Sequence, residues 1–83
     1  MYYVYFLKLS NEQIYTGMTG QLKQRVLEHK NQKVKATKNR QPVKLIGYEA
    51  YSLKPDAQRR ERFLKTTEGK RLFRQQYRDI LNS

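Results

Sequence analysis

The chain has no cysteine and no tryptophan, a single histidine, and only 7 acidic residues among its 83. Without cysteine there is no disulfide framework and no thiolate zinc site, which excludes secreted disulfide scaffolds and zinc ribbons. No apolar run approaches the roughly 20 residues that span a membrane, and the apolar N-terminus lacks the basic region and cleavage site of a signal peptide. We therefore expect a cytoplasmic protein that forms one small domain over residues 1–83.

Basic residues are abundant instead. The 18 Lys and Arg residues give a formal net charge of +11, and such a surplus attracts phosphate backbones through the release of counterions. The 7 tyrosines and 3 phenylalanines could add stacking surfaces for bases, although some of these rings must belong to the core. Charge and aromatic content together favour nucleic acid as the partner over the alternative that the charge only maintains solubility.

The hydrophobic pattern predicts three strands. Residues rich in β-formers favour strands at 2–9, 13–17 and 43–51, with the first two joined as a hairpin. Gly17 and Gly20 predict a loop between them, because glycine adopts tight bends easily. These segments predict an α+β fold with the order β-β-α-β-α-α, in which helices flank a small, mostly antiparallel three-stranded sheet.

The same pattern predicts three helices. Helical periodicity runs from Gln21 to about Lys33, and Pro55 begins a second helix at a position that tolerates proline. Gly69 is predicted to end that second helix. The apolar stripe of the third helix consists of Phe73, Tyr77, Ile80 and Leu81.

Two polar residues share the apolar face of the first predicted helix. Helical spacing places Arg25 and His29 beside Leu22 and Val26 on that face. On an isolated basic helix such a pair is usually solvated. Beside the tyrosines of the hairpin, the pair could instead stabilise phosphate charge and assist proton transfer.

Glu61 shares a helix face with Ala57 and Leu64, so we expect its carboxylate to face the sheet. An inward-facing carboxylate needs a compensating partner, because burying an unpaired charge is costly. Two partners are open. One is a basic side chain, which is the commoner case, and the other is a divalent cation, which prefers oxygen ligands.

The segment from residue 31 to 41 is polar and rich in Lys, Arg and Asn. It predicts an exposed, mobile loop whose charge suits phosphate contact. A simply solvated charge run explains the same composition equally well.

Two tyrosine motifs, Val4-Tyr5-Phe6 and Tyr15-Thr16-Gly17, precede Leu22-x-x-Arg25-x-x-x-His29 and a later Arg60-Glu61. In this order and spacing they resemble the GIY-YIG nuclease family over nearly the whole chain. The resemblance is strongest to its small, stand-alone bacterial members. Both name-giving motifs are degenerate, so the complete string carries the resemblance.

The resemblance implies a metal-dependent endonuclease that hydrolyses phosphodiester bonds in DNA with low sequence specificity. It assigns Glu61 to a single Mg²⁺ or Mn²⁺ ion, Arg25 to the developing phosphorane charge, and His29 to proton shuttling or water positioning. Tyr5 and Tyr15 match the paired tyrosines, with Tyr5 preferred as the group that activates water. A tyrosine pKa near 10 must fall for this role, and a nearby cation or metal would lower it. Candidate phosphate contacts are Lys23, Lys35, Lys38, Arg40 and Lys65.

Two other functions stay open. The chain could be a nucleic-acid-binding module that has kept the fold and lost catalysis, or an adaptor that acts only inside a DNA repair complex. No base-reading helix-turn-helix or zinc finger is present in the pattern, so shape rather than sequence is expected to guide binding. We expect a monomer whose main partner is DNA.

Overall fold

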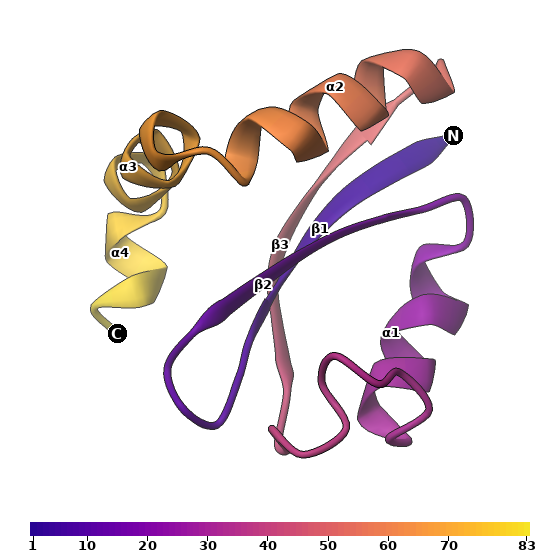
Figure 1. The fold of residues 1–83 in the computed structure, drawn as a ribbon, viewed down its shortest axis with the longest axis vertical. Coiled ribbons are helices and arrows are strands. Elements are labelled where there is room, and N and C mark those ends of the chain that lie inside the picture. The colour runs from indigo at the N-terminus through magenta and orange to yellow at the C-terminus, as the bar shows by residue number, and fades with distance from the viewer.

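Three strands form a single antiparallel sheet at the centre of the computed structural model, which describes all 83 residues (Figure 1). The strands are β1 (Tyr2–Lys8), β2 (Ile14–Thr19) and β3 (Lys44–Tyr51). Their spatial order is β2-β1-β3, with β1 antiparallel to both neighbours. The predicted α+β class is therefore confirmed, and β2 and β3 are the two edges of the sheet.

Four helices follow the predicted order, with one addition at the C-terminus. They are α1 (Leu22–Lys30), α2 (Lys54–Leu64), α3 (Thr67–Gln76) and α4 (Arg78–Leu81). Tyr77 lies between the last two, so the stripe predicted for one helix is divided between α3 and α4. None of these helices is long and apolar enough to cross a membrane.

The sheet separates two hydrophobic cores, because successive side chains of a strand point to opposite faces. Figure 1 shows α2, α3 and α4 on one side of the sheet and α1 on the other. One core consists of Val4, Phe6, Ala57, Leu64 and Phe73, and the other of Tyr5, Leu7, Leu9 and Val43. The central strand thus places Tyr5 on the face covered by α1.

The loop predicted between Gly17 and Gly20 is wrong, because β2 continues through both intervening residues. Met18 pairs with Val4, and the strand ends only at Thr19. Gly17 has a packing role instead, since a Cβ there would lie 2.5 Å from the Cζ and hydroxyl oxygen of Tyr5. The missing side chain leaves the space that the Tyr5 ring occupies.

The helix end predicted at Gly69 is also wrong. The second helix ends at Leu64, and Gly69 lies in the first turn of α3, where its N–H donates to the Thr66 side chain at 3.1 Å. A Cβ at this position would collide with the backbone carbonyl oxygen of Phe63. Glycine is needed here because two helices meet with their backbones in contact.

The segment that joins α1 to β3, residues 31–43, folds back against α1. Val34 and Thr37 are buried, and the Gln41 amide donates a hydrogen bond to the backbone carbonyl of His29 at 2.7 Å. The helix itself ends at Lys30, earlier than predicted. The prediction of a wholly exposed loop is therefore wrong, although its basic side chains are exposed.

Candidate active site

Three buried side chains form a hydrogen-bonded chain beneath α1. The Tyr5 hydroxyl lies 2.8 Å from Nε2 of His29, and Nδ1 of His29 lies 2.8 Å from Oγ1 of Thr37. The exposed fraction is 1% for Tyr5 and 0% for the other two. Sequence reasoning singled out Tyr5 and His29 but missed Thr37, which it placed in an exposed loop.

Tyr15 lies beside this chain. Its ring centroid is 6.3 Å from that of Tyr5 and 5.1 Å from that of His29. The odd-numbered positions of β2 face the same side of the sheet as Tyr5, and Gly17 between them leaves room for the rings to approach. The fold thus brings together both tyrosines of the motifs and the histidine of α1.

Arg25 lies one turn before His29, and its positive charge acts on both Tyr5 and His29. Its guanidinium forms an ion pair with Glu28 at 2.9 Å, and this hydrogen bond lowers the pKa of the Glu28 carboxyl. The guanidinium also acts on the Tyr5 hydroxyl, whose pKa it lowers against the larger effect of burial. Glu28 was missed from the sequence, although its spacing of three residues from Arg25 is a usable signal.

The protonation states follow from burial. Desolvation raises the pKa of Tyr5 to about 12, and the opposing effect of Arg25 is smaller. Arg25 lowers this pKa, as expected of a neighbouring cation, but burial outweighs it and the net shift is upward. Burial and the charge of Arg25 lower the pKa of His29. At neutral pH the pair consists of a protonated tyrosine and a neutral imidazole that can accept its proton.

Glu61 on α2 is the carboxylate whose charge reaches Tyr5, where it acts to raise the pKa of the hydroxyl. Its side chain is 23% exposed and forms an ion pair with Lys65 at 3.4 Å. The commoner of the two predicted partners, a basic side chain, is therefore present. The adjacent Arg60 binds Glu49 on β3 with two hydrogen bonds, at 3.0 and 3.2 Å, and so ties α2 to the sheet.

The donor set around Glu61 limits the kind of metal it could hold. No group of three or more histidine, aspartate and glutamate side chains is arranged to bind an ion. Mg²⁺ commonly uses one or two carboxylates and completes its shell with water and substrate phosphate oxygens. A single glutamate therefore fits an ion that binds together with a phosphodiester, and does not fit a cage built from protein ligands alone.

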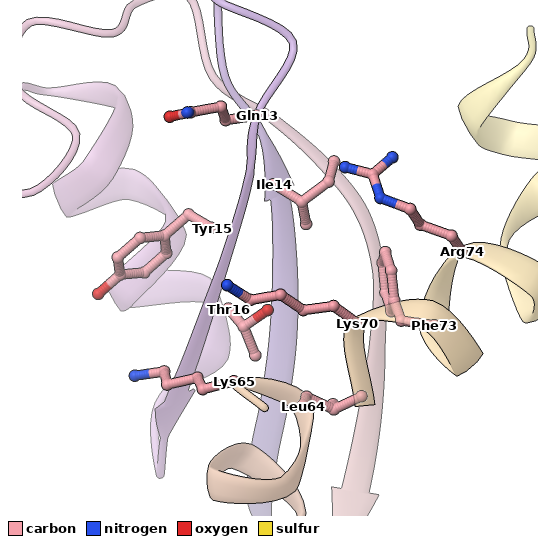
Figure 2. Close-up of a pocket in the computed structure, with 9 residues that line it drawn as sticks. All are labelled: Gln13, Ile14, Tyr15, Thr16, Leu64, Lys65, Lys70, Phe73 and Arg74. Carbon is pink, nitrogen blue, oxygen red and sulfur yellow. The ribbon is translucent and has the colours of Figure 1, made fainter. Parts of the chain in front are cut away.

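A groove runs along the free edge of β2, between this strand and the junction of α2 and α3 (Figure 2). Its volume is about 440 Å³. The residues that line this β2 groove are Gln13, Ile14, Tyr15, Thr16, Leu64, Lys65, Lys70, Phe73 and Arg74. Tyr15 lines the groove at the edge of β2, but its ring points to the other face of the sheet, where it contacts His29. The groove and the buried chain therefore lie on opposite sides of this edge strand.

The β2 groove is lined by three cations and by no carboxylate. Figure 2 shows the Lys65 and Lys70 side chains extending from the helices toward the strand that carries Tyr15. Lys70 and Arg74 take part in none of the ion pairs of the chain. Sequence reasoning missed both, although two basic residues four apart on a helix are neighbours on its surface.

The predicted phosphate contacts lie in three places. Lys23 is exposed on α1, and Lys35, Lys38 and Arg40 are exposed on the segment that follows it. Of the five, only Lys65 lines the β2 groove. The structure brings together four of the predicted catalytic residues, Tyr5, Tyr15, Arg25 and His29, whereas Glu61 on α2 contacts Lys65.

A family model described as the GIY-YIG catalytic domain matches residues 1–77. The chain belongs to the GIY-YIG family. A UPF0213 protein of Clostridium perfringens is 44% identical over 66 residues, which cover 78% of this chain and 71% of the relative. A UPF0213 protein of Haloquadratum walsbyi is 35% identical over 82 residues, covering 95% of this chain and 92% of the relative.

A solved structure agrees with this GIY-YIG assignment. The solution NMR structure of a UPF0213 protein from Bacillus halodurans matches with a TM-score of 0.57 and 31% sequence identity. The match covers 88% of this chain and 82% of that one. The resemblance drawn from the tyrosine motifs is therefore confirmed at the level of family and fold.

Proposed function

We propose that this GIY-YIG domain is a metal-dependent endonuclease that hydrolyses phosphodiester bonds in DNA. One observation carries the proposal, namely the convergence of Tyr5, Tyr15, Arg25 and His29 on one face of β2, across the edge of this strand from a groove lined by cations. Acid–base groups, a fixed cation and a binding surface for phosphates are the parts that phosphodiester hydrolysis requires. Membership of a family with a catalytic domain supports the same conclusion.

The geometry suggests a route for the proton of the attacking water. The hydroxyl of Tyr5, with a pKa of about 12, is a poor base alone, but its own proton has an acceptor 2.8 Å away in His29. Tyr5 would take a proton from water as it passes its own to Nε2 of the neutral imidazole. Positioned acid–base groups of this kind typically accelerate a reaction about 10²–10⁴-fold.

Charge on the reacting phosphate would be stabilised from two sides. The guanidinium of Arg25 is planar, permanently charged and able to donate several hydrogen bonds to phosphate oxygens. Glu61 would hold a single Mg²⁺ or Mn²⁺ ion, which when bound would polarise the phosphodiester and neutralise charge on its oxygens. Tyr15, which lines the groove, would contact the substrate beside the reacting group.

The substrate strand would lie in the β2 groove. Lys65, Lys70 and Arg74 offer positive charge there without a competing carboxylate, and Lys and Arg contacts to the backbone bind any sequence. This arrangement supports low sequence specificity.

The proposal is tested by cleavage of end-labelled single-stranded, duplex and branched DNA with Mg²⁺ or Mn²⁺. We expect Glu61→Gln to lower cleavage at least about 100-fold, as losses of transition-state stabilisation commonly do, while DNA binding in EDTA is retained. Asp79→Asn is the matched control. It also removes one carboxylate charge, but from an exposed residue of α4 that forms no ion pair.

Two results would contradict parts of this proposal. If the wild-type protein binds these DNAs but cleaves none of them with either metal, the domain is a binding module that has lost catalysis. If Glu61→Gln cleaves as fast as Asp79→Asn, Glu61 does not hold the metal.

A further inference from the structure

Thr37 makes a contact that its sequence context does not predict. It lies eight residues after His29 in a basic segment, yet its hydroxyl is 2.8 Å from Nδ1 of the imidazole and its exposed fraction is 0%. The same hydroxyl lies 3.5 Å from the backbone carbonyl oxygen of Val34. It is the only side chain that forms a hydrogen bond with Nδ1.

The placement of Thr37 is secured by the backbone around it. The Gln41 amide nitrogen donates to the carbonyl of His29 at 2.7 Å and to the carbonyl of Thr37 at 3.3 Å. One side chain thus ties the end of α1 to the turn that carries the threonine. The hydroxyl is fixed relative to the imidazole ring rather than free to rotate away with a loop.

The direction of the hydrogen bonds follows from the Val34 carbonyl at one end of the chain. A carbonyl oxygen can only accept, so the Thr37 hydroxyl donates its proton to Val34 and is left to accept from Nδ1 of His29. The imidazole is neutral, because burial lowers its pKa, and therefore carries one N–H. With that N–H on Nδ1, Nε2 is the atom that accepts the proton of Tyr5.

We propose that Thr37 is a positioning residue that holds His29 in the tautomer with the proton on Nδ1, and so keeps Nε2 free to accept a proton from Tyr5. The hydroxyl does not reach the substrate and acts only through the imidazole. The other tautomer would place N–H against the Tyr5 oxygen, and the proton of Tyr5 would then have no acceptor in the ring. The effect on cleavage rests on the proposed nuclease function, whereas the tautomer does not.

The tautomer can be measured directly by long-range ¹H–¹⁵N correlation NMR of uniformly ¹⁵N-labelled protein at neutral pH. His29 is the single histidine of the chain, so its ring nitrogens need no assignment by mutagenesis. We expect Nδ1 to show the shift of a protonated nitrogen and Nε2 that of an acceptor. A wild-type spectrum with the proton on Nε2 would overturn the proposal without any variant being made.

Two variants separate the hydroxyl from the shape of the side chain. Thr37→Val keeps the volume and removes the hydroxyl, so we expect the tautomer with the proton on Nε2 to become populated. Cleavage should fall about ten- to a hundredfold, the range that a small misplacement of a reacting group can cause. Thr37→Ser keeps the hydroxyl and should keep both the wild-type ring shifts and near wild-type cleavage. Circular dichroism and thermal melts establish that each variant is folded.

The outcomes distinguish this proposal from the proposed function. If the wild-type protein cleaves no DNA, the NMR measurement still decides the tautomer and the role of Thr37 in setting it. If Thr37→Val is folded and retains the wild-type ring shifts, Thr37 does not set the tautomer. If the shifts change but cleavage does not, the tautomer has no part in the reaction.

Discussion

His29 is an imidazole held neutral inside the protein, and this couples stability to pH. Burial and Arg25 lower its pKa in the folded state from the ordinary value of 6.5, with Glu28 opposing the shift. As the pH falls through about 6.5, the unfolded chain binds a proton that the folded protein does not. The free energy of unfolding should therefore fall by up to about 1.4 kcal/mol between about pH 7.5 and 5.5, as measured by urea unfolding.

The control for this prediction is His29→Gln, whose amide can retain a hydrogen bond but does not titrate. The variant should be less stable at every pH and show a flatter dependence over this range. Carboxylates such as Glu28, whose pKa is lowered further by Arg25, titrate below the range and do not contribute. A wild-type curve that is flat, or a variant curve with the same slope, would show that His29 titrates normally in the folded protein.

Single residues were predictable where a spacing identified them. The motifs singled out Tyr5 and His29 although 24 positions separate them, because a family pattern preserves the order and spacing of its functional side chains. Thr37 was not predictable, since its neighbours in the sequence are basic and solvated. Its burial depends on how residues 31–43 turn back to α1, and no periodicity in that segment indicates such a turn.

At the scale of helices, Gly69 explains how α2 and α3 meet. Alanine favours a helix over glycine by about 1 kcal/mol, but a Cβ here would press into the Phe63 carbonyl and lie 2.8 Å from the Leu64 Cα. These are backbone atoms, which cannot move without shifting a helix. We expect Gly69→Ala to lower the free energy of unfolding by about 1–3 kcal/mol, as measured by urea unfolding.

Gln75→Ala provides the comparison for this substitution. Gln75 is exposed on the same helix, and its replacement should change stability by no more than about 0.5 kcal/mol. Gly69→Ala as stable as the wild-type protein would mean that the helices can separate at little cost.

The elements were predictable to within a few residues, because alternation and helical periodicity are local signals. The two wrongly predicted breaks came from glycines. Gly17 and Gly69 predict breaks when their conformational freedom alone is considered, yet both lie inside regular elements. Each is needed because another group occupies the space of a side chain, the ring of Tyr5 in one case and the Phe63 backbone in the other. Such contacts depend on how neighbouring elements pack, so neither alternation nor helical periodicity in the sequence indicates them.

At the scale of the whole molecule, most of the basic residues behind the net charge of +11 have no acidic partner. Six of the 7 acidic residues form ion pairs, each with a different basic residue, which leaves twelve of the 18 basic residues without an acidic partner. Lys70 and Arg74 belong to this group and line the β2 groove, to which Tyr15 also contributes. Composition predicted the class of partner, but only the fold shows which cations lie next to the candidate catalytic residues.

Charge reversal can separate the β2 groove from the total charge. Lys70→Glu/Arg74→Glu and a control, Lys44→Glu/Lys54→Glu, each lower the net charge from +11 to +7. The control residues are exposed at the start of β3 and of α2. In EDTA, fluorescence anisotropy with labelled single-stranded DNA measures affinity as salt is raised. If both groove residues bind phosphates, the slope of log K against log salt should become shallower by about 1.4 in the groove variant, while the control stays near the wild-type slope because its cations make no phosphate contact. Equal losses in both variants would mean that DNA responds to the charge of the whole surface and not to this groove.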